Sequence, residues 1–304
     1  MKNLSNLLSA RWLNMGIGLL ILLLHLSVAK AQKGKADIKI ISYNILQGMR
    51  SDTTEGKQRF VSWIKKNAPD VLALQEVTGF TQSGLESLAR AYGHPYAALL
   101  IEGEKYPVAI TSKYPVTNVR KVTDNMDRGF IQADILGQTF VVLHLSPFDY
   151  RTRKIEIDLV LANVHSQPHI KNWVLLGDFN SFSPVDADAY TDGRLIANLK
   201  KYEEKYSPIK KLIDGKIDFS TISTVLENGF YDALKVHHKG FVKTVHPKKF
   251  HPPNGPDVPT RIDYVFVSKT LKNRVKSAEV MVDEFTDQHS DHYPMFTELS
   301  LPGQ

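Results

Sequence analysis

Several predicted strands of this 304-residue chain end in side chains that can bind a cation, carry a proton or accept a hydrogen bond. Carboxylate and amide oxygens suit Mg²⁺, Mn²⁺ or Ca²⁺, and an imidazole beside a carboxylate suits proton transfer near neutral pH. These side chains occur in six short segments: Ser42-Tyr43-Asn44, Leu74-Gln75-Glu76, Leu143-His144-Leu145, Gly177-Asp178-Phe179-Asn180, Arg261-Ile262-Asp263-Tyr264 and Ser290-Asp291-His292.

Taken singly, each segment has a plainer interpretation. Asp and Asn directly after a strand usually form turns or caps, and a lone histidine in an apolar run, such as His144, is usually a hydrogen-bonded core residue. The six segments are far apart in sequence but lie at equivalent strand ends. This arrangement favours strands that deliver their polar ends to one shared pocket.

Three motifs follow one another in a specific order: Gly177-Asp178-Phe179-Asn180, Arg261-Ile262-Asp263-Tyr264-Val265 and Ser290-Asp291-His292-Tyr293-Pro294. This ordered set resembles the endonuclease/exonuclease/phosphatase family, which contains pancreatic-type deoxyribonucleases, abasic-site nucleases, neutral sphingomyelinases and inositol polyphosphate 5-phosphatases. The resemblance extends from Lys39 to Leu301. It implies a phosphoester hydrolase with a four-layered α/β sandwich, in which two packed mixed β-sheets are flanked by helices.

The resemblance also implies which residues hold a divalent metal ion. Glu76 matches the principal metal ligand of the family, Asn44 lies beside it, and Asp291 matches an additional acidic residue close to the metal. A phosphodiester requires a hard cation because its anionic oxygens repel a nucleophile and its leaving oxygen has to be stabilised. Mg²⁺ is the expected cofactor, with Mn²⁺ or Ca²⁺ as alternatives.

The remaining motif residues match positions that handle the proton and the phosphate. His292 matches the general base, which acts on the attacking water, and Asp263 matches the carboxylate that orients its imidazole. Asp178 and Asn180 match residues that contact the nucleophile and the scissile phosphate. His144 matches a donor to the phosphate or to the leaving oxygen.

Hydrophobic patterning predicts the elements that position these side chains. Apolar runs predict strands at 38–43, 71–74, 96–101, 108–112, 130–135, 140–145, 173–176 and 262–267, and helical spacing predicts helices near 60–66, from 85 onward, at 152–166 and near 195–206. In the third helix, Ile155, Leu159 and Ala162 form the expected apolar face. The pattern alone suggests a layered α/β sandwich.

The first 31 residues have the layout of a secretory signal. Lys2 and Arg11 precede an apolar core, and Ala29-Lys30-Ala31 provides a cleavage site after Ala31. We therefore expect a signal at 1–31, a catalytic domain at 32–304 and a periplasmic or secreted enzyme; the alternative is an uncleaved segment that anchors the chain in a membrane. The chain contains no cysteine, which excludes disulfides, thiolate ligands and thiol nucleophiles.

The sequence constrains the substrate less than the reaction. The formal net charge of +6 falls to +3 without Lys2, Arg11 and Lys30, so the basic surplus is modest. We expect a phosphodiesterase that acts on nucleic acid or other extracellular phosphodiesters, with no stable protein partner. The alternatives are a sphingomyelinase-like or phosphatase-like enzyme on the same fold and a non-catalytic binding protein.

A nucleic-acid groove requires basic and aromatic side chains. The candidates are Arg50, Lys57, Arg128, Tyr150, Arg151, Arg153, Lys248 and Lys249. For Asp127-Arg128-Gly129, however, a surface turn is the favoured interpretation over a phosphate contact.

Overall fold

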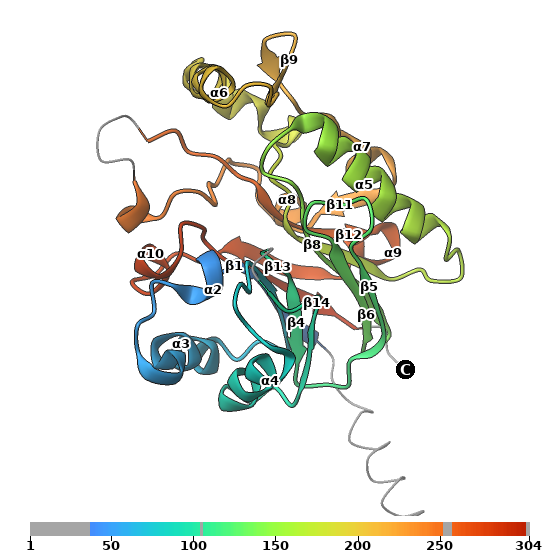
Figure 1. The fold of residues 1–304 in the computed structure, drawn as a ribbon. Helices are drawn as coiled ribbons and strands as arrows, with labels where there is room; N and C mark the ends of the chain where they lie inside the picture. Colours follow the sequence, from blue (N-terminus) through green and yellow to red (C-terminus); the bar gives the residue numbers. More distant parts are fainter. Residues whose placement is uncertain (1–36, 104–105, 252–256, 302–304) are drawn as a thin grey trace, which may run out of the picture. The chain divides into compact units, whose positions relative to one another are not determined.

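Two six-stranded sheets carry the fold (Figure 1). The computed structural model describes residues 37–103, 106–251 and 257–301. In spatial order, the first sheet consists of β13 (Val275–Val280), β14 (Met295–Ser300), β1 (Asp37–Asn44), β2 (Val71–Gln75), β4 (Ala109–Ser112) and β3 (Tyr96–Leu99). The second consists of β11 (Phe230–Asp232), β12 (Asp263–Ser268), β8 (Trp173–Asp178), β7 (Gln138–His144), β6 (Phe130–Ile135) and β5 (Thr117–Val122).

The described helices connect these strands. They are α3 (Gln58–Asn67), α4 (Gln82–Ala91), α5 (Tyr150–His165), α6 (Arg194–Lys205), α7 (Ser220–Glu227), α8 (Ala233–His237), α9 (Lys269–Lys272) and α10 (Thr286–His289), with short turns α2 (Leu46–Met49), η1 (Glu55–Lys57), η2 (Pro184–Tyr190) and η3 (Lys248–Phe250). A small hairpin of β9 (Leu212–Ile213) and β10 (Lys216–Ile217) follows α6.

A parallel pair of strands lies inside each sheet. β1 runs parallel to β2 and β7 to β8, whereas β2 is antiparallel to β4 and β8 is antiparallel to β12. β2, β7 and β8 are buried along their whole length. A strand covered on both faces needs no polar alternation, which explains the continuous apolar runs that predicted them.

Helices cover the outer face of each sheet, as Figure 1 shows for α3, α4, α5 and α7. Trp63 of α3 and Leu85 of α4 pack with Leu72 of the first sheet, and Val160 of α5 packs with Leu175 of the second. β2 contacts β7 and β8, so the inner faces of the sheets meet. These four layers confirm the predicted α/β sandwich.

The predicted apolar face of α5 is wrong, although the helix itself is correct. Ile155 is 57% exposed, Ala162 is exposed and Leu159 is half-buried. The side that faces the sheet carries Arg153, Glu156, Ile157, Val160, Leu161 and Val164. Two charged residues on the buried face hid it from a search for apolar spacing.

Patterning also missed several elements, namely β5, β11, β13, the β9–β10 hairpin, α7 and α8. β5 is exposed along nearly its whole length and has no apolar face to reveal it. α7 is rich in Ser, Thr, Ile and Val, which are weak helix formers, and it packs Ile222 and Val225 into the core beside α5. Tertiary packing therefore decides the conformation of this segment.

The predicted signal at 1–31 lies outside the described residues. Within the part of the chain that the structure describes, no helix is long and apolar enough to cross a membrane. The elements between Ile38 and Leu299 form one compact unit. The division into a signal and a catalytic domain at 32–304 stays a prediction.

Candidate active site

Three neighbouring strands of the second sheet place His144, Asp178 and Asp263 side by side. In the register of the sheet, Asp178 of β8 pairs with His144 of β7 on one side and with Asp263 of β12 on the other. Paired residues on adjacent strands point to the same face. One face of this sheet edge therefore carries two carboxyl groups and an imidazole, all of them buried.

Gly177 permits the close pairing of β7 and β8 at this point. Its φ of +141° is rarely adopted by other residues, and a Cβ at this position would lie 2.0 Å from the carbonyl oxygen of Leu143. Leu143 directly precedes His144 in β7, and Gly177 directly precedes Asp178 in β8. The glycine of the Gly-Asp-Phe-Asn motif thus allows the approach of the strands that bring His144 to Asp178.

The first sheet contributes Asn44 and Glu76 from the ends of β1 and β2. The Nδ2 of Asn44 lies 3.1 Å from Oδ2 of Asp178 and 3.4 Å from Oε1 of Glu76. Asn44 therefore connects the polar edges of the two sheets. Glu76 itself is only partly buried, with 15% of its side chain exposed.

A left-handed turn wraps around Glu76. The four residues of α2, from Leu46 to Met49, have φ angles between +47° and +67°. The Gln47 N–H donates to the Glu76 carboxylate over 2.9 Å, and the Gly48 N–H donates to the Glu76 carbonyl over 2.8 Å. Such a run of positive φ values is costly for residues other than glycine and is typical of functional sites.

His292 is held between two carboxylates. Its Nδ1 lies 2.8 Å from Oδ2 of Asp263, and its Nε2 lies 3.8 Å from Oδ2 of Asp178. The Ser290 hydroxyl fixes the preceding loop because it donates to the Asn44 carbonyl over 2.6 Å and accepts from the His292 N–H over 3.2 Å. The terminal motif is therefore tied to both sheets.

The charges of this cluster shift the protonation of its members. Burial alone would lower the pKa of His292, but the carboxylates of Asp263 and Asp178 outweigh it and raise the pKa well above its usual value. Burial raises the pKa of Asp263, partly offset by His292. For Asp178, the effect of burial is outweighed by His144 and His292, and the pKa lies below its usual value.

A buried arginine anchors the strand that carries Asp263. Nε and Nη2 of Arg261 each lie 2.6 Å from Oδ2 of Asp186, and Nη1 donates to Asp232 over 2.6 Å. Its guanidinium also stacks over the ring of Tyr264, 4.5 Å from the centroid. The arginine of the Arg-Ile-Asp-Tyr motif therefore fixes the start of β12 rather than facing solvent.

Arg128 is in a turn, as predicted, but its side chain is buried in the cluster and does not lie at the surface. Its Nη1 is 2.6 Å from Nε2 of His144 and 3.8 Å from Oε1 of Glu76, and its guanidinium lies over the ring of Tyr106. The side chain is 8% exposed. Asp127-Arg128-Gly129 resembles an ordinary turn in sequence, and only the position just before β6 could have indicated that the arginine reaches the ends of β7 and β2.

A comparison of the sequence with protein families decides the classification. The sequence model of the endonuclease/exonuclease/phosphatase family matches residues 41–292. The chain belongs to this family. The family includes nucleases and phosphatases, so the protein is a phosphoester hydrolase of a divalent-metal-dependent class, as predicted.

Solved structures share the fold of this family member. A 3′ phosphatase from Neisseria bound to a product DNA hairpin is 21% identical, with a TM-score of 0.63, over 87% of this chain and 100% of that chain. An AP endonuclease from Archaeoglobus fulgidus is 18% identical, with a TM-score of 0.62, over 87% and 100%. A family member from Beutenbergia cavernae is 18% identical, with a TM-score of 0.61, over 88% and 72%. No curated protein matches the chain.

Two sets of side chains in this family member could hold a cation. Glu76 offers a partly exposed carboxylate, with Asn44 beside it. Asp178, Asp263 and His292 form a second, buried set whose ligand atoms lie within 4.8 Å of one another. The second set is already joined internally, because Asp263 and His292 are hydrogen-bonded to each other. Glu76 therefore has the more available oxygen atoms.

The predicted ligands carry donor atoms of the kind that a hard divalent cation prefers. Carboxylates at Glu76 and Asp291 and an amide at Asn44 supply oxygen donors, as Mg²⁺ prefers. The amide nitrogen of Asn44, however, faces Glu76, while its oxygen accepts from the Leu46 N–H over 3.1 Å. Asn44 would offer oxygen to a cation at Glu76 only after its amide group rotates by half a turn.

Asn180 and Asp291 occupy the partly exposed rim of the cluster. The Asn180 N–H donates to Asp178 over 2.8 Å, and its side-chain Nδ2 donates to the Leu145 carbonyl over 3.0 Å. Oδ1 of Asp291 lies 3.4 Å from the Ser290 hydroxyl oxygen, whose proton is donated to Asn44. Asn180 thus links the loops after β7 and β8.

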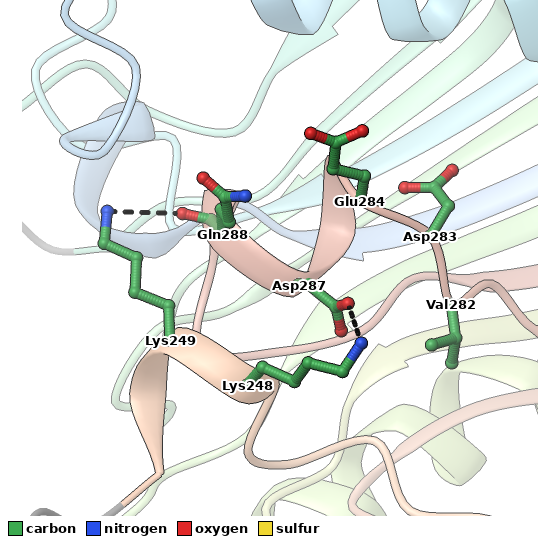
Figure 2. A pocket seen from close by; sticks show the side chains of 7 residues that line it. All are labelled: Lys248, Lys249, Val282, Asp283, Glu284, Asp287 and Gln288. Carbon is green, nitrogen blue, oxygen red and sulfur yellow. Dashed lines mark hydrogen bonds and ion pairs between the residues drawn. The ribbon is translucent and has the colours of Figure 1, made fainter.

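Several candidates for a nucleic-acid groove are already engaged in other contacts. Arg153 is buried and donates to the Ser146 carbonyl, and Arg151 is paired with Asp149. Figure 2 shows a hollow beside α10 in which Lys248 pairs with Asp287 over 2.7 Å. Lys248 and Lys249 therefore border a surface of mixed charge.

Proposed function

We propose that this protein is an exported, Mg²⁺-dependent phosphodiesterase that acts on nucleic acid. The observation that carries the reaction type is the buried row of Asp263, His292 and Asp178 beside the oxygen donors of Glu76. A general base needs an acceptor that orients it and a position for the water that it activates, and this row provides both.

In this proposal, the neutral form of His292 acts as the base: Asp263 accepts from its Nδ1, and its Nε2 can take a proton from a water held near Asp178. Asn180 positions Asp178 through its N–H. The Arg128 guanidinium contacts His144 and lies 3.8 Å from Glu76. Arg128 and His144 would donate to phosphate oxygens or to the leaving oxygen. Glu76, Asn44 and Asp291 would hold the cation, which would supply positive charge for the phosphate oxygens and lower the pKa of a water near it.

Nucleic acid is the proposed substrate on two grounds. The similar structures include a 3′ phosphatase bound to a DNA hairpin and an AP endonuclease. Arg128 also places a guanidinium, the planar donor that suits phosphate, in the cluster itself. Export is proposed from residues 1–31, and a mature chain beginning at Gln32 outside the cytoplasm would support it.

Hydrolysis of bis(p-nitrophenyl) phosphate tests the reaction type. We expect turnover with Mg²⁺ or Mn²⁺, loss of turnover with EDTA, and a decrease in kcat of roughly 10²–10⁴-fold for His292→Ala. His165→Ala, which removes an exposed histidine from α5, is the control and should retain activity. Turnover that persists both with EDTA and in His292→Ala contradicts the proposed chemistry.

A substrate panel tests the choice of nucleic acid. We expect cleavage of plasmid DNA or RNA that weakens steeply with salt, because phosphate contacts release counterions. Hydrolysis of sphingomyelin, phosphoinositides or phosphomonoesters without cleavage of nucleic acid would instead assign the protein to another substrate branch of the family.

A further inference from the structure

Glu156 is a fully buried carboxylate that belongs to no motif of the sequence. It extends from the sheet-facing side of α5. Its Oε1 accepts from the Asp127 N–H and its Oε2 from the Ser146 N–H, both over 2.7 Å. Burial raises the pKa of Glu156, and these two hydrogen bonds act against that rise. One side chain therefore holds the backbones of two separate loops.

Both loops carry residues of the candidate active site. Asp127 directly precedes Arg128, whose Nη1 lies 2.6 Å from His144 and 3.8 Å from Glu76. Ser146 follows His144 by two residues. By binding both amides, Glu156 thus fixes the position of the Arg128 loop relative to the end of β7, which carries His144.

The neighbouring residue Leu145 extends this connection to β8. Its N–H donates to the Asp178 carbonyl over 2.9 Å, and its carbonyl accepts from Nδ2 of Asn180 over 3.0 Å. A shift of the loop at Ser146 would therefore be passed to Asn180. Glu156 acts on both the arginine and the asparagine without touching either.

A second charged residue of α5 secures the same loop. Arg153, one turn before Glu156, donates to the Ser146 carbonyl over 3.3 Å. Ser146 is therefore held at its N–H by a carboxylate and at its carbonyl by a guanidinium. Burying two charged side chains is less favourable than apolar packing. Their presence here is therefore better explained by the loop that they hold than by a gain in stability.

We propose that Glu156 is a positioning residue that sets Arg128 and His144 for contact with the phosphate. This inference rests on the proposed function. In Glu156→Gln, the amide oxygen can accept from only one loop, and the NH₂ group faces the other N–H donor. We expect kcat/KM to fall about 10–100-fold, the range found when residues behind active-site ligands are changed.

A double-mutant cycle separates positioning from general stability. If Glu156 acts through Arg128, Glu156→Gln should have little further effect on kcat/KM in an Arg128→Ala background. Asp158→Asn is the matched control, since Asp158 is an exposed acid of the same helix, and it should leave kcat/KM unchanged. Glu156→Asp keeps the charge but shortens the side chain. If Glu156→Gln fails to fold, Glu156→Asp replaces it and should show the same fall in kcat/KM.

Amide hydrogen exchange gives a readout that does not depend on turnover. In Glu156→Gln, exchange should accelerate at Asp127 and Ser146 and stay unchanged in the first sheet. Unchanged exchange at both amides overturns the positioning role. Equal losses of kcat/KM with and without Arg128 overturn its action through Arg128. Absence of metal-dependent hydrolysis by the unaltered protein instead refutes the proposed function, and the exchange result still decides whether Glu156 fixes the two loops.

Discussion

Asp178 is the residue on which the two sheets converge. Its Oδ2 lies 3.1 Å from Asn44, 3.3 Å from His144 and 3.8 Å from His292, while Oδ1 accepts from the Asn180 N–H. Burying one carboxylate among four polar groups is favourable only if these groups supply hydrogen bonds or positive charge. The ionised form of Asp178 therefore depends on its neighbours.

Asp263→Asn tests the orientation of His292. The substitution removes a charge that raises the pKa of His292, so that pKa should fall. The acidic limb of the kcat profile should move to lower pH, because the neutral imidazole then persists to lower pH, and kcat should decrease roughly 10²-fold. The measurement is kcat as a function of pH. An unchanged profile would mean that Asp263 does not control the protonation of His292.

The motif residues were predictable because each lies at one end of a recognisable strand. Asn44, Glu76, His144, Asp178 and Asp263 all lie at strand ends, and the structure brings them together. Arg128 was considered only as a groove residue in a surface turn, and Glu156 was not recognised at all. Arg128 is in an unremarkable turn, and Glu156 interrupts an apolar face, so neither follows a periodic signal.

At the scale of elements, the pairing of β7 with β8 aligns His144 with Asp178. Gly177 allows this pairing, since its Cα faces the Leu143 carbonyl without an intervening side chain. The strands themselves were predictable from their apolar runs. Their partners were not, because neighbours in a sheet are set by tertiary packing and not by the local pattern.

Gly177→Ala should destabilise the fold by on the order of 3 kcal/mol, because it adds both backbone strain and a contact with the Leu143 carbonyl. The measurement is the free energy of unfolding from denaturant titration. Gly137→Ala is the matched control, since Gly137 also has positive φ but open space around its Cα, and it should cost only about 1 kcal/mol. Equal losses in the two variants would rule out the close approach as the cause.

At the scale of the whole molecule, stability should depend on a histidine far from the catalytic cluster. His94 is buried, and its ring nitrogens contact the Thr111 hydroxyl and the Pro69 carbonyl, each over 2.9 Å. Burial lowers its pKa to about 4. Between the ordinary histidine pKa of about 6.5 and a pH of about 4, this histidine is therefore protonated in the unfolded chain but not in the folded protein.

The contribution of His94 to the free energy of unfolding should consequently be greatest above about pH 6.5. It should decrease by about 3 kcal/mol as the pH falls toward 4. Denaturant titrations across this range provide the measurement. His94→Gln cannot titrate there and should lose less stability over the same interval. Parallel losses in both proteins would show that another group is responsible.

The overall architecture was predictable from sequence because long apolar runs and ordered motifs report on a layered fold. The helix near 195–206 was also predictable, but the elements that directly follow α6 were not, since the β9–β10 hairpin and α7 are short and their residues have weak local preferences. Only contacts with the rest of the molecule define these elements.

The assembly of the cluster from both sheets has a consequence during synthesis. The Ser290 hydroxyl and the Asn44 carbonyl are bonded across 246 residues, and His292 follows two positions later. Contacts of such sequence separation close slowly and late in folding. In the proposed mechanism, a nascent chain that already contains Asn44, Glu76, His144 and Asp178 still lacks His292 as its proton acceptor, so we expect it to be inactive until nearly the whole sandwich has been made.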